Sequence, residues 1–255
     1  MGSQLKLNEQ GGYRYLQGIA PYSSGVIAVS GREIVHVTLD MPVHWRQGLF
    51  AARQHLEQQG LEHYCLCGVE LRCPEPHSMG GFIDFNKQYQ TLLEEWDMLV
   101  EGENPVARTN VAPVVSPPRD TLLYGFSHTK PSEFEQSTFV VAGGGELPHR
   151  ELSDQHIVKF GETSEAAMLD KARCVVDIMR TRLKRLEANE GLLSSVDVYC
   201  AHPVHDILRD VIIPGIPEAA RVGIQWSYAQ PPIQNIEFEM DLRGVRREIV
   251  ISGQV

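Results

Sequence analysis

The stretch from Ile216 to Leu242, IPEAARVGIQWSYAQPPIQNIEFEMDL, decides the fold that the sequence predicts. Its last part alternates without a break, because apolar side chains take every second position and charged ones fill the positions between. Such a period of two is typical of a strand with one buried face. The apolar members are Ile236, Phe238, Met240 and Leu242, and the charged members are Glu237, Glu239, Asp241 and Arg243.

The first part of the stretch predicts a second strand. Arg221 leads into an apolar run that reaches Trp226, and Gln230-Pro231-Pro232 follows as a turn, because neither proline can donate a hydrogen bond to a sheet. The pattern therefore predicts a hairpin with an arginine on one strand and carboxylates on the other. An arginine can hold a carboxylate ligand by two hydrogen bonds, and a nearby glutamate can position water or move a proton. The alternative is a ladder of ion pairs on an exposed sheet face.

Composition limits the class of protein. A chain of 255 residues, 42% of them hydrophobic, is long enough for one large domain or two smaller ones with real cores. Its formal net charge of -10 argues against a nucleic-acid partner and against an anionic membrane surface. The polar N-terminal segment contains no apolar run that would serve as a signal or a membrane span. The five cysteines form no paired pattern, which favours buried thiols in a reducing cytoplasm.

Outward from the opening stretch, the hydrophobic pattern alternates between strand and helix signals. Apolar residues that recur every three or four positions predict helices at 43–60, 85–100 and 162–186. Short apolar runs bounded by glycine or proline predict the strands. These strands are expected at 26–31, 33–39, 64–73, 106–115, 121–127, 139–142 and 196–201.

The order of elements repeats once along the chain. The separation of Gly31 from Gly145 agrees within one residue with that of Arg108 from Arg221. The repeat predicts an α+β protein with two tandem domains, at residues 1–130 and 131–255, joined near Lys130. Each domain is expected to be a mainly antiparallel sheet with two helices on one face.

The residues at these landmarks resemble those of a known family. The segment APYSSGVIAVSG followed by NPVARTNVAPVVSPPRDTLLYGFS is similar to the RidA/YjgF reactive-intermediate deaminases, and so is FVVAGGGELP followed by EAARVGIQWSYAQPPIQNIEFEMDL. The resemblance implies tandem chorismate-mutase-like, RidA-type domains. It also implies rings of three such units with ligand sites between neighbours, and hence a homotrimer or a higher multiple.

The resemblance also implies an activity and its residues. The activity is hydrolytic deamination of a small carboxylate-bearing enamine, imine or amino-unsaturated acid, without a metal or any other cofactor. Arg221 would bind the substrate carboxylate and Glu237 would position the water. Arg108 and Tyr22 match the first copy of the motif, whereas Leu123 or Tyr124 falls where the first copy needs its glutamate. A site shared by the two domains would therefore gather Tyr22, Arg221 and Glu237.

Two further motifs leave alternatives open. In Gly143-Gly144-Gly145 no Gly-Lys-Ser/Thr follows, so the glycines predict either a bend at the strand end or a close approach of the backbone at Gly144 and Gly145 to a ligand, rather than a phosphate loop. His202 and His205 are expected to be a surface or interface pair rather than zinc ligands. The alternatives to a deaminase are a metabolite-binding regulatory protein that keeps the arginine pocket, and a chorismatase-like lyase or hydrolase.

Overall fold

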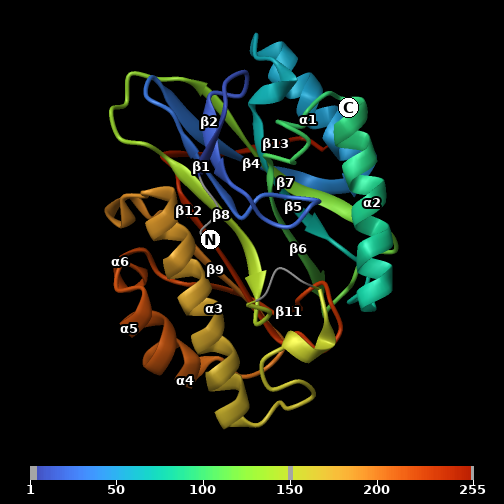
Figure 1. Cartoon of the computed structure of the whole chain (residues 1–255), viewed down its shortest axis with the longest axis vertical. Coiled ribbons are helices and arrows are strands. Elements are labelled where there is room, and N and C mark those ends of the chain that lie inside the picture. The colour runs from blue at the N-terminus through green and yellow to red at the C-terminus, as the bar shows by residue number, and fades with distance from the viewer. Residues whose placement is uncertain (1–4, 149–151, 254–255) are drawn as a thin grey trace.

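Two mixed β-sheets pack face to face between two layers of helices in the computed structural model, which describes residues 5–148 and 152–253 (Figure 1). The seven-stranded sheet has the order β1-β2-β3-β8-β12-β9-β10, and the six-stranded sheet has the order β11-β6-β5-β7-β4-β13. Parallel pairs occur in both sheets, at β9/β10, β5/β6 and β4/β13, and the other neighbours are antiparallel.

The strands of the two sheets come from all parts of the chain. The seven-stranded sheet consists of β1 (Leu5–Asn8), β2 (Tyr13–Leu16), β3 (Gly25–Ala28), β8 (Phe139–Gly145), β9 (Ser195–Cys200), β10 (Gln225–Ser227) and β12 (Phe238–Gly244). The six-stranded sheet consists of β4 (Arg32–His44), β5 (Leu66–Arg72), β6 (Ala107–Pro113), β7 (Leu122–Pro131), β11 (Ala229–Gln230) and β13 (Arg247–Ile251).

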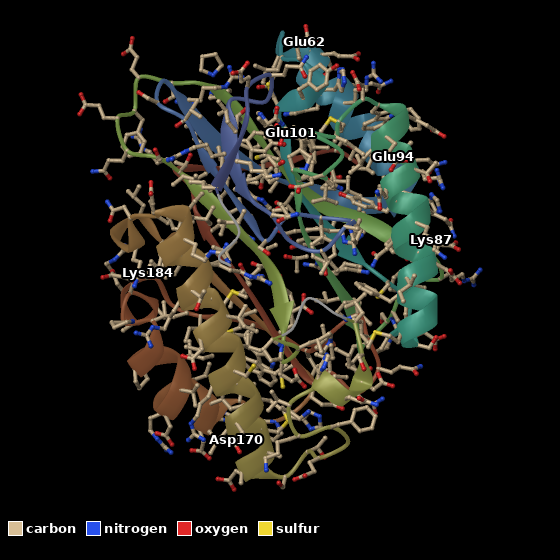
Figure 2. All side chains as sticks on the ribbon, in the orientation of Figure 1. Glu62, Lys87, Glu94, Glu101, Asp170 and Lys184 are labelled. Atoms are coloured by element: carbon tan, nitrogen blue, oxygen red, sulfur yellow. The ribbon has the colours of Figure 1, made fainter. Side chains whose placement is uncertain are left out.

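Helices cover the outer face of each sheet. Helices α1 (Trp45–Gln58) and α2 (Met79–Glu95) pack on the six-stranded sheet, and α3 (Glu165–Leu186) packs on the seven-stranded one. The short helices α4 (His205–Ile207), α5 (Ile213–Gly215) and α6 (Ala219–Val222) lie beside α3. Figure 2 shows Lys87 and Glu94 on α2 and Lys184 on α3 at the outside of the molecule, because these helices turn their apolar stripes toward the sheets.

Helix α3 follows the sequence signals closely. The Ser164 side chain caps its first turn by accepting a hydrogen bond from the Ala167 N–H, and Glu165 adds a negative charge to that turn. Lys184 and Arg185 lie in the last turn, where positive charge suits the helix dipole. The expected helix at 162–186 and the expected strand at 196–201 therefore agree with α3 and β9 within three residues.

The expected fold of two tandem chorismate-mutase-like, RidA-type domains is wrong. Each half was expected to carry its own mainly antiparallel sheet with two helices on one face, but both sheets combine strands from before and after residue 130. β3 bonds to β8 in one sheet, and β13 bonds to β4 in the other. The division of the chain at residues 130 and 131 stays a prediction.

The expected hairpin also does not form. Arg221 lies in α6, because the preceding Pro-Glu-Ala-Ala is a good first turn of a helix. β10 and β12 lie on opposite sides of β9, and β11 bonds to β6 in the other sheet. The spacing from Arg108 to Arg221 therefore relates a strand residue to a helix residue and marks no structural repeat.

The two faces of β12 have very different neighbours, and both are buried. Phe238, Met240 and Leu242 enter the apolar core under α3, as the alternation predicts. The alternative of an ion-pair ladder placed the charged face in solvent. In the structure this face is buried against the six-stranded sheet. Its residues Glu239, Asp241 and Arg243 are all buried.

Arg243 connects the two sheets through three carboxyl groups. Its Nη1 lies 2.9 Å from Glu70 Oε1 on β5, 3.2 Å from Asp197 Oδ2 on β9 and 3.7 Å from Asp241 Oδ1 on β12. Burial, together with the neighbouring Asp197 and Glu70, raises the pKa of Asp241 well above its usual range. Asp241 Oδ2 also accepts a hydrogen bond from the Tyr199 hydroxyl at 3.0 Å. One arginine therefore holds the interior of the sandwich together.

Removing this arginine should destabilise the fold. We expect Arg243→Ala to lower the free energy of unfolding by roughly 3–5 kcal/mol, because it leaves buried carboxyl groups without their cation. Arg173→Ala is the matched control, since Arg173 forms an exposed ion pair with Asp170 and should cost less than about 1 kcal/mol. Urea unfolding measures both values, and equally small losses would show that the arginine does not hold the sheets together.

Candidate active site

One cavity of about 650 Å³ opens where β6, β8 and β12 meet α3. Its walls come from both sheets and from the segments around Ile19, Leu147 and Ile233. Apolar side chains line much of it, and a few polar groups converge in it, which is the usual make-up of a small-molecule site. The polar lining includes Tyr22, Arg108, Asn110, Arg182 and Glu239.

Arg108 is a buried cation surrounded by aromatic rings. Its guanidinium carbon lies 4.4 Å from the ring centre of Tyr22 and 4.8 Å from that of Tyr89, with Phe82 and Phe85 slightly farther away. Nη2 donates to Asn86 Oδ1 at 2.6 Å, while Nη1 has no hydrogen-bond partner among the described residues. A guanidinium that is 2% exposed and has a free donor has the chemistry to bind an anion.

Arg182 brings a second guanidinium to the cavity from α3. Its Nη1 donates to the carbonyl oxygens of Ala142 at 2.7 Å and Gly143 at 3.2 Å, which fixes the side chain across the end of β8. Burial lowers the pKa of both Arg108 and Arg182, but an arginine starts so far above neutrality that both stay charged. Arg108 and Arg182 therefore bring positive charge to different walls of the cavity.

Glu239 is the buried carboxyl group of the cavity, only 5% exposed, whereas Asp177 on α3 also lines the cavity but is exposed. Burial raises its pKa to about 8, although Arg182 and Arg108 act in the opposite direction. A carboxyl group with this pKa is largely protonated at neutral pH and can release its proton nearby. It therefore has the property that a general acid and base needs near pH 7.

The three glycines at the end of β8 make room for these side chains. A Cβ on Gly143 would collide with Glu239 Oε1, and a Cβ on Gly144 would lie 3.0 Å from Arg182 Nη1. A Cβ on Gly145 would lie 2.5 Å from Ile236. Gly144 and Gly145 line the cavity, and the space that they leave is occupied by the cavity's own side chains. Their predicted approach to a ligand stays a prediction.

The structure separates the predicted site residues into two groups. Tyr22, Arg108, Gly144 and Gly145 line the cavity together. Arg221 does not line it, because α6 carries this arginine to the surface, where it is paired with Glu218 and bonded to the carbonyl oxygens of Gly191 and Leu193. The role predicted for Arg221 stays a prediction.

Glu237 likewise lies outside the lining of the cavity. It pairs with His202, with 3.0 Å between its Oε2 and the ring Nε2, so the histidine predicted as a surface or interface residue has a carboxylate partner. Within residues 5–148 and 152–253, no cluster of three or more histidine, cysteine, aspartate or glutamate side chains has the arrangement of a metal site. The catalytic role predicted for Glu237 stays a prediction.

Sequence reasoning missed Glu239, Arg182 and Asn110. Glu239 has the same parity as Glu237 on one strand, so alternation cannot choose between them. Arg182 stands beside the apolar stripe of α3, where a charged residue normally faces water. Asn110 follows Arg108 by two positions, which places both on the same side of an expected strand, and this was the one available signal.

Comparison with known proteins identifies the family. A family model described as 2-aminomuconate deaminase CnbZ matches residues 5–249, so the chain belongs to this family of deaminases, enzymes that act on C–N bonds. It is 35% identical over 253 residues to 2-amino-5-chloromuconate deaminase of Comamonas testosteroni, across 94% of this chain and 96% of that one. A crystal structure of a chorismatase aligns with a TM-score of 0.46 and 9% identity, over 94% of this chain and 79% of that chain.

The family assignment corrects one expectation and confirms another in part. The expected membership of the RidA/YjgF family is wrong, because the matching model is that of the CnbZ family. The motifs that suggested RidA/YjgF were individually short, and the spacing that linked them marks no structural repeat. The prediction of an enzyme that acts on C–N bonds is confirmed at the level of the family.

No helix of the described chain is long and apolar enough to cross a membrane.

The fit between Gly143 and Glu239 can be tested directly. We expect Gly143→Ala to lower the free energy of unfolding by roughly 1–3 kcal/mol, because the added methyl group displaces the buried carboxyl group or the neighbouring Thr109. Gly80→Ala in α2 is the control, since nothing lies within 4 Å of an added Cβ there and alanine favours the helix. Urea unfolding separates the two, and a neutral Gly143→Ala would contradict the close packing.

Proposed function

We propose that the protein is an enzyme that hydrolyses the C–N bond of a 2-amino-2,4-dienedioate of the 2-aminomuconate type in this cavity and releases ammonia. One observation carries the proposal: the buried guanidinium of Arg108, the half-buried guanidinium of Arg182 and a carboxyl group with a pKa of about 8 line one small cavity. The family supports it, because the names of its model and of the Comamonas testosteroni relative both describe aminomuconate deaminases.

The two arginines suit a dicarboxylate. Arg108 offers its free Nη1 from β6, and Arg182 offers the charge of a second guanidinium from α3. A ligand with one carboxylate at each end can meet both charges at once, which offsets the cost of burying them. Tyr22 lies over the Arg108 guanidinium and shields it from water, which strengthens its attraction for an anion.

Glu239 supplies the proton transfers. In its protonated form it adds a proton to a carbon of the dienamine, and the nitrogen lone pair completes a C=N bond at C2. The resulting carboxylate takes a proton from water as the water oxygen bonds to C2. Glu239 then gives that proton to the nitrogen, which leaves as ammonia with the electron pair of the C–N bond. The C2 hydroxyl returns its own proton to Glu239 as the C–O bond becomes the carbonyl of a 2-oxo acid, which restores the protonated Glu239. No electrons are gained or lost, because water is the only other reactant.

The assignment of Glu239 can be separated from that of Glu237. We expect Glu239→Gln to lower kcat by about 10²–10⁴-fold, because glutamine can neither give nor take the proton. Glu237→Gln is the matched control, because Glu237 lies two positions earlier, just before β12, and outside the cavity lining, and it should retain activity within a few-fold. The assay is ammonia release from 2-aminomuconate. For the wild type, kcat/KM should fall as pH rises through about 8, where Glu239 loses its proton.

These variants also test the alternatives. Loss of activity in Glu237→Gln with retention in Glu239→Gln would place the chemistry at the Glu237–His202 pair instead. If the wild type binds the substrate without releasing ammonia, the protein is a binding protein and the proposal fails.

The second carboxylate anchor is testable with a lysine substitution. We expect Arg182→Lys to raise KM for the dicarboxylate about tenfold, because lysine keeps the charge but loses the planar fork. Arg221→Lys provides the control, since it changes an exposed arginine outside the cavity and should leave KM unchanged. Steady-state kinetics, with melting temperatures to verify folding, decide between them. A raised KM in Arg221→Lys alone would support Arg221 as the anchor.

A further inference from the structure

We propose that Asn110 recognises the 2-amino carboxylate end of the substrate and so fixes which end of the dicarboxylate meets β6. The inference deepens the proposed function and rests on it. It would make Asn110 a specificity residue for a ligand that carries an N–H group on the carbon bearing its carboxylate.

The Asn110 side chain is a buried polar group without a partner. It lines the cavity and is 3% exposed. Neither Oδ1 nor Nδ2 has a hydrogen-bond partner among the residues that the structure describes. Burying an amide without partners is unfavourable, so native proteins satisfy almost all such groups. An amide that faces a cavity in this state is ready to bond a ligand.

Arg108 belongs to the same arrangement. It precedes Asn110 by two positions on β6, so both side chains project from the same side of the strand, and both line the cavity. Arg108 Nη1 and Asn110 Nδ2 are N–H donors, Asn110 Oδ1 is an acceptor, and none of the three has a partner among the described residues. Together they form a short row of polar groups on β6. Thr109, between them, contacts Gly143 in the space between the sheets instead.

A 2-amino carboxylate complements this row. Its carboxylate accepts hydrogen bonds, so it suits the Arg108 guanidinium and the Asn110 N–H donors. Its enamine or imine nitrogen carries N–H, so it suits Asn110 Oδ1. The other carboxylate is then left for Arg182. This orientation brings the carbon that loses nitrogen toward β6 and gives each end of the ligand a different neighbour.

The same contact distinguishes substrate from product. The 2-oxo acid formed by hydrolysis has a carbonyl oxygen where the substrate had an N–H donor, so Oδ1 loses its partner. A site built to bond an N–H group rejects a ligand without it more strongly than an apolar site would. Asn110 therefore favours the substrate and assists release of the product.

The test uses two stable ligands that need no turnover. Pyrrole-2,5-dicarboxylate and furan-2,5-dicarboxylate share the six-carbon dicarboxylate skeleton, and they differ in having N–H or O on the carbons that carry the carboxylates. By calorimetry at pH 7, the wild type should bind the pyrrole about five- to tenfold more tightly than the furan. Asn110→Leu, of similar volume, should abolish this preference while both ligands still bind.

A second variant keeps the test decisive if Asn110→Leu does not fold. Asn110→Asp retains a carboxyl oxygen as acceptor, so it should bind both ligands more weakly and still prefer the pyrrole. Equal binding of the two ligands by the wild type, or an unchanged preference in Asn110→Leu, would overturn the role of Asn110 and leave the dicarboxylate site intact. Binding of neither ligand by the wild type would overturn the dicarboxylate site and this inference together.

Discussion

The charged face of β12 is buried between two sheets, and the rest of the structure depends on how that charge is satisfied. A sheet with one polar face normally turns it to water. Here the opposing sheet supplies Glu70, and β9 supplies Asp197, so that Arg243 is surrounded by acceptors. Because the cost of an unpaired buried charge is large, only one alignment of the two sheets satisfies this arginine. The network therefore fixes the register of the sandwich as well as its stability.

The same face of β12 changes in character along its length. Arg243 is in direct contact with carboxyl groups, and Asp241, whose pKa is raised by burial, accepts a hydrogen bond from Tyr199. Glu239, at the other end of the row, is not within ion-pair distance of a cation in the described structure and opens onto the cavity. One face of β12 thus carries the buried ion pairs of Arg243 at one end and the Glu239 carboxyl group, which faces the cavity, at the other. Substituting either end changes a different property of the protein.

Sequence reasoning succeeded where a local pattern decides the structure and failed where distant segments meet. The stripe and caps of α3 and the alternation of β12 are local, and both were predicted. β13 bonds to β4, whose sequence lies some two hundred positions earlier, and no local pattern predicts that pairing. Prediction of the candidate site had the same limit. Arg108 and Tyr22 were predicted from short motifs, whereas Arg182 reaches the cavity only because α3 crosses β8. Choosing Glu239 over Glu237 requires knowing which carboxyl group faces the cavity, and alternation gives both the same face.

The electrostatics of the cavity also explain how one carboxyl group can serve as an acid and then as a base. In the empty cavity Arg108 and Arg182 draw the pKa of Glu239 down, against the larger effect of burial. When the carboxylates of the proposed substrate bind to those arginines, the positive field at Glu239 weakens and its pKa rises, so it keeps its proton until the dienamine takes it. Protonation of the dienamine creates a cation at C2 and nitrogen. That new positive charge stabilises the Glu239 carboxylate, which is then available to accept a proton from water. The substrate itself therefore sets the order of the two proton transfers.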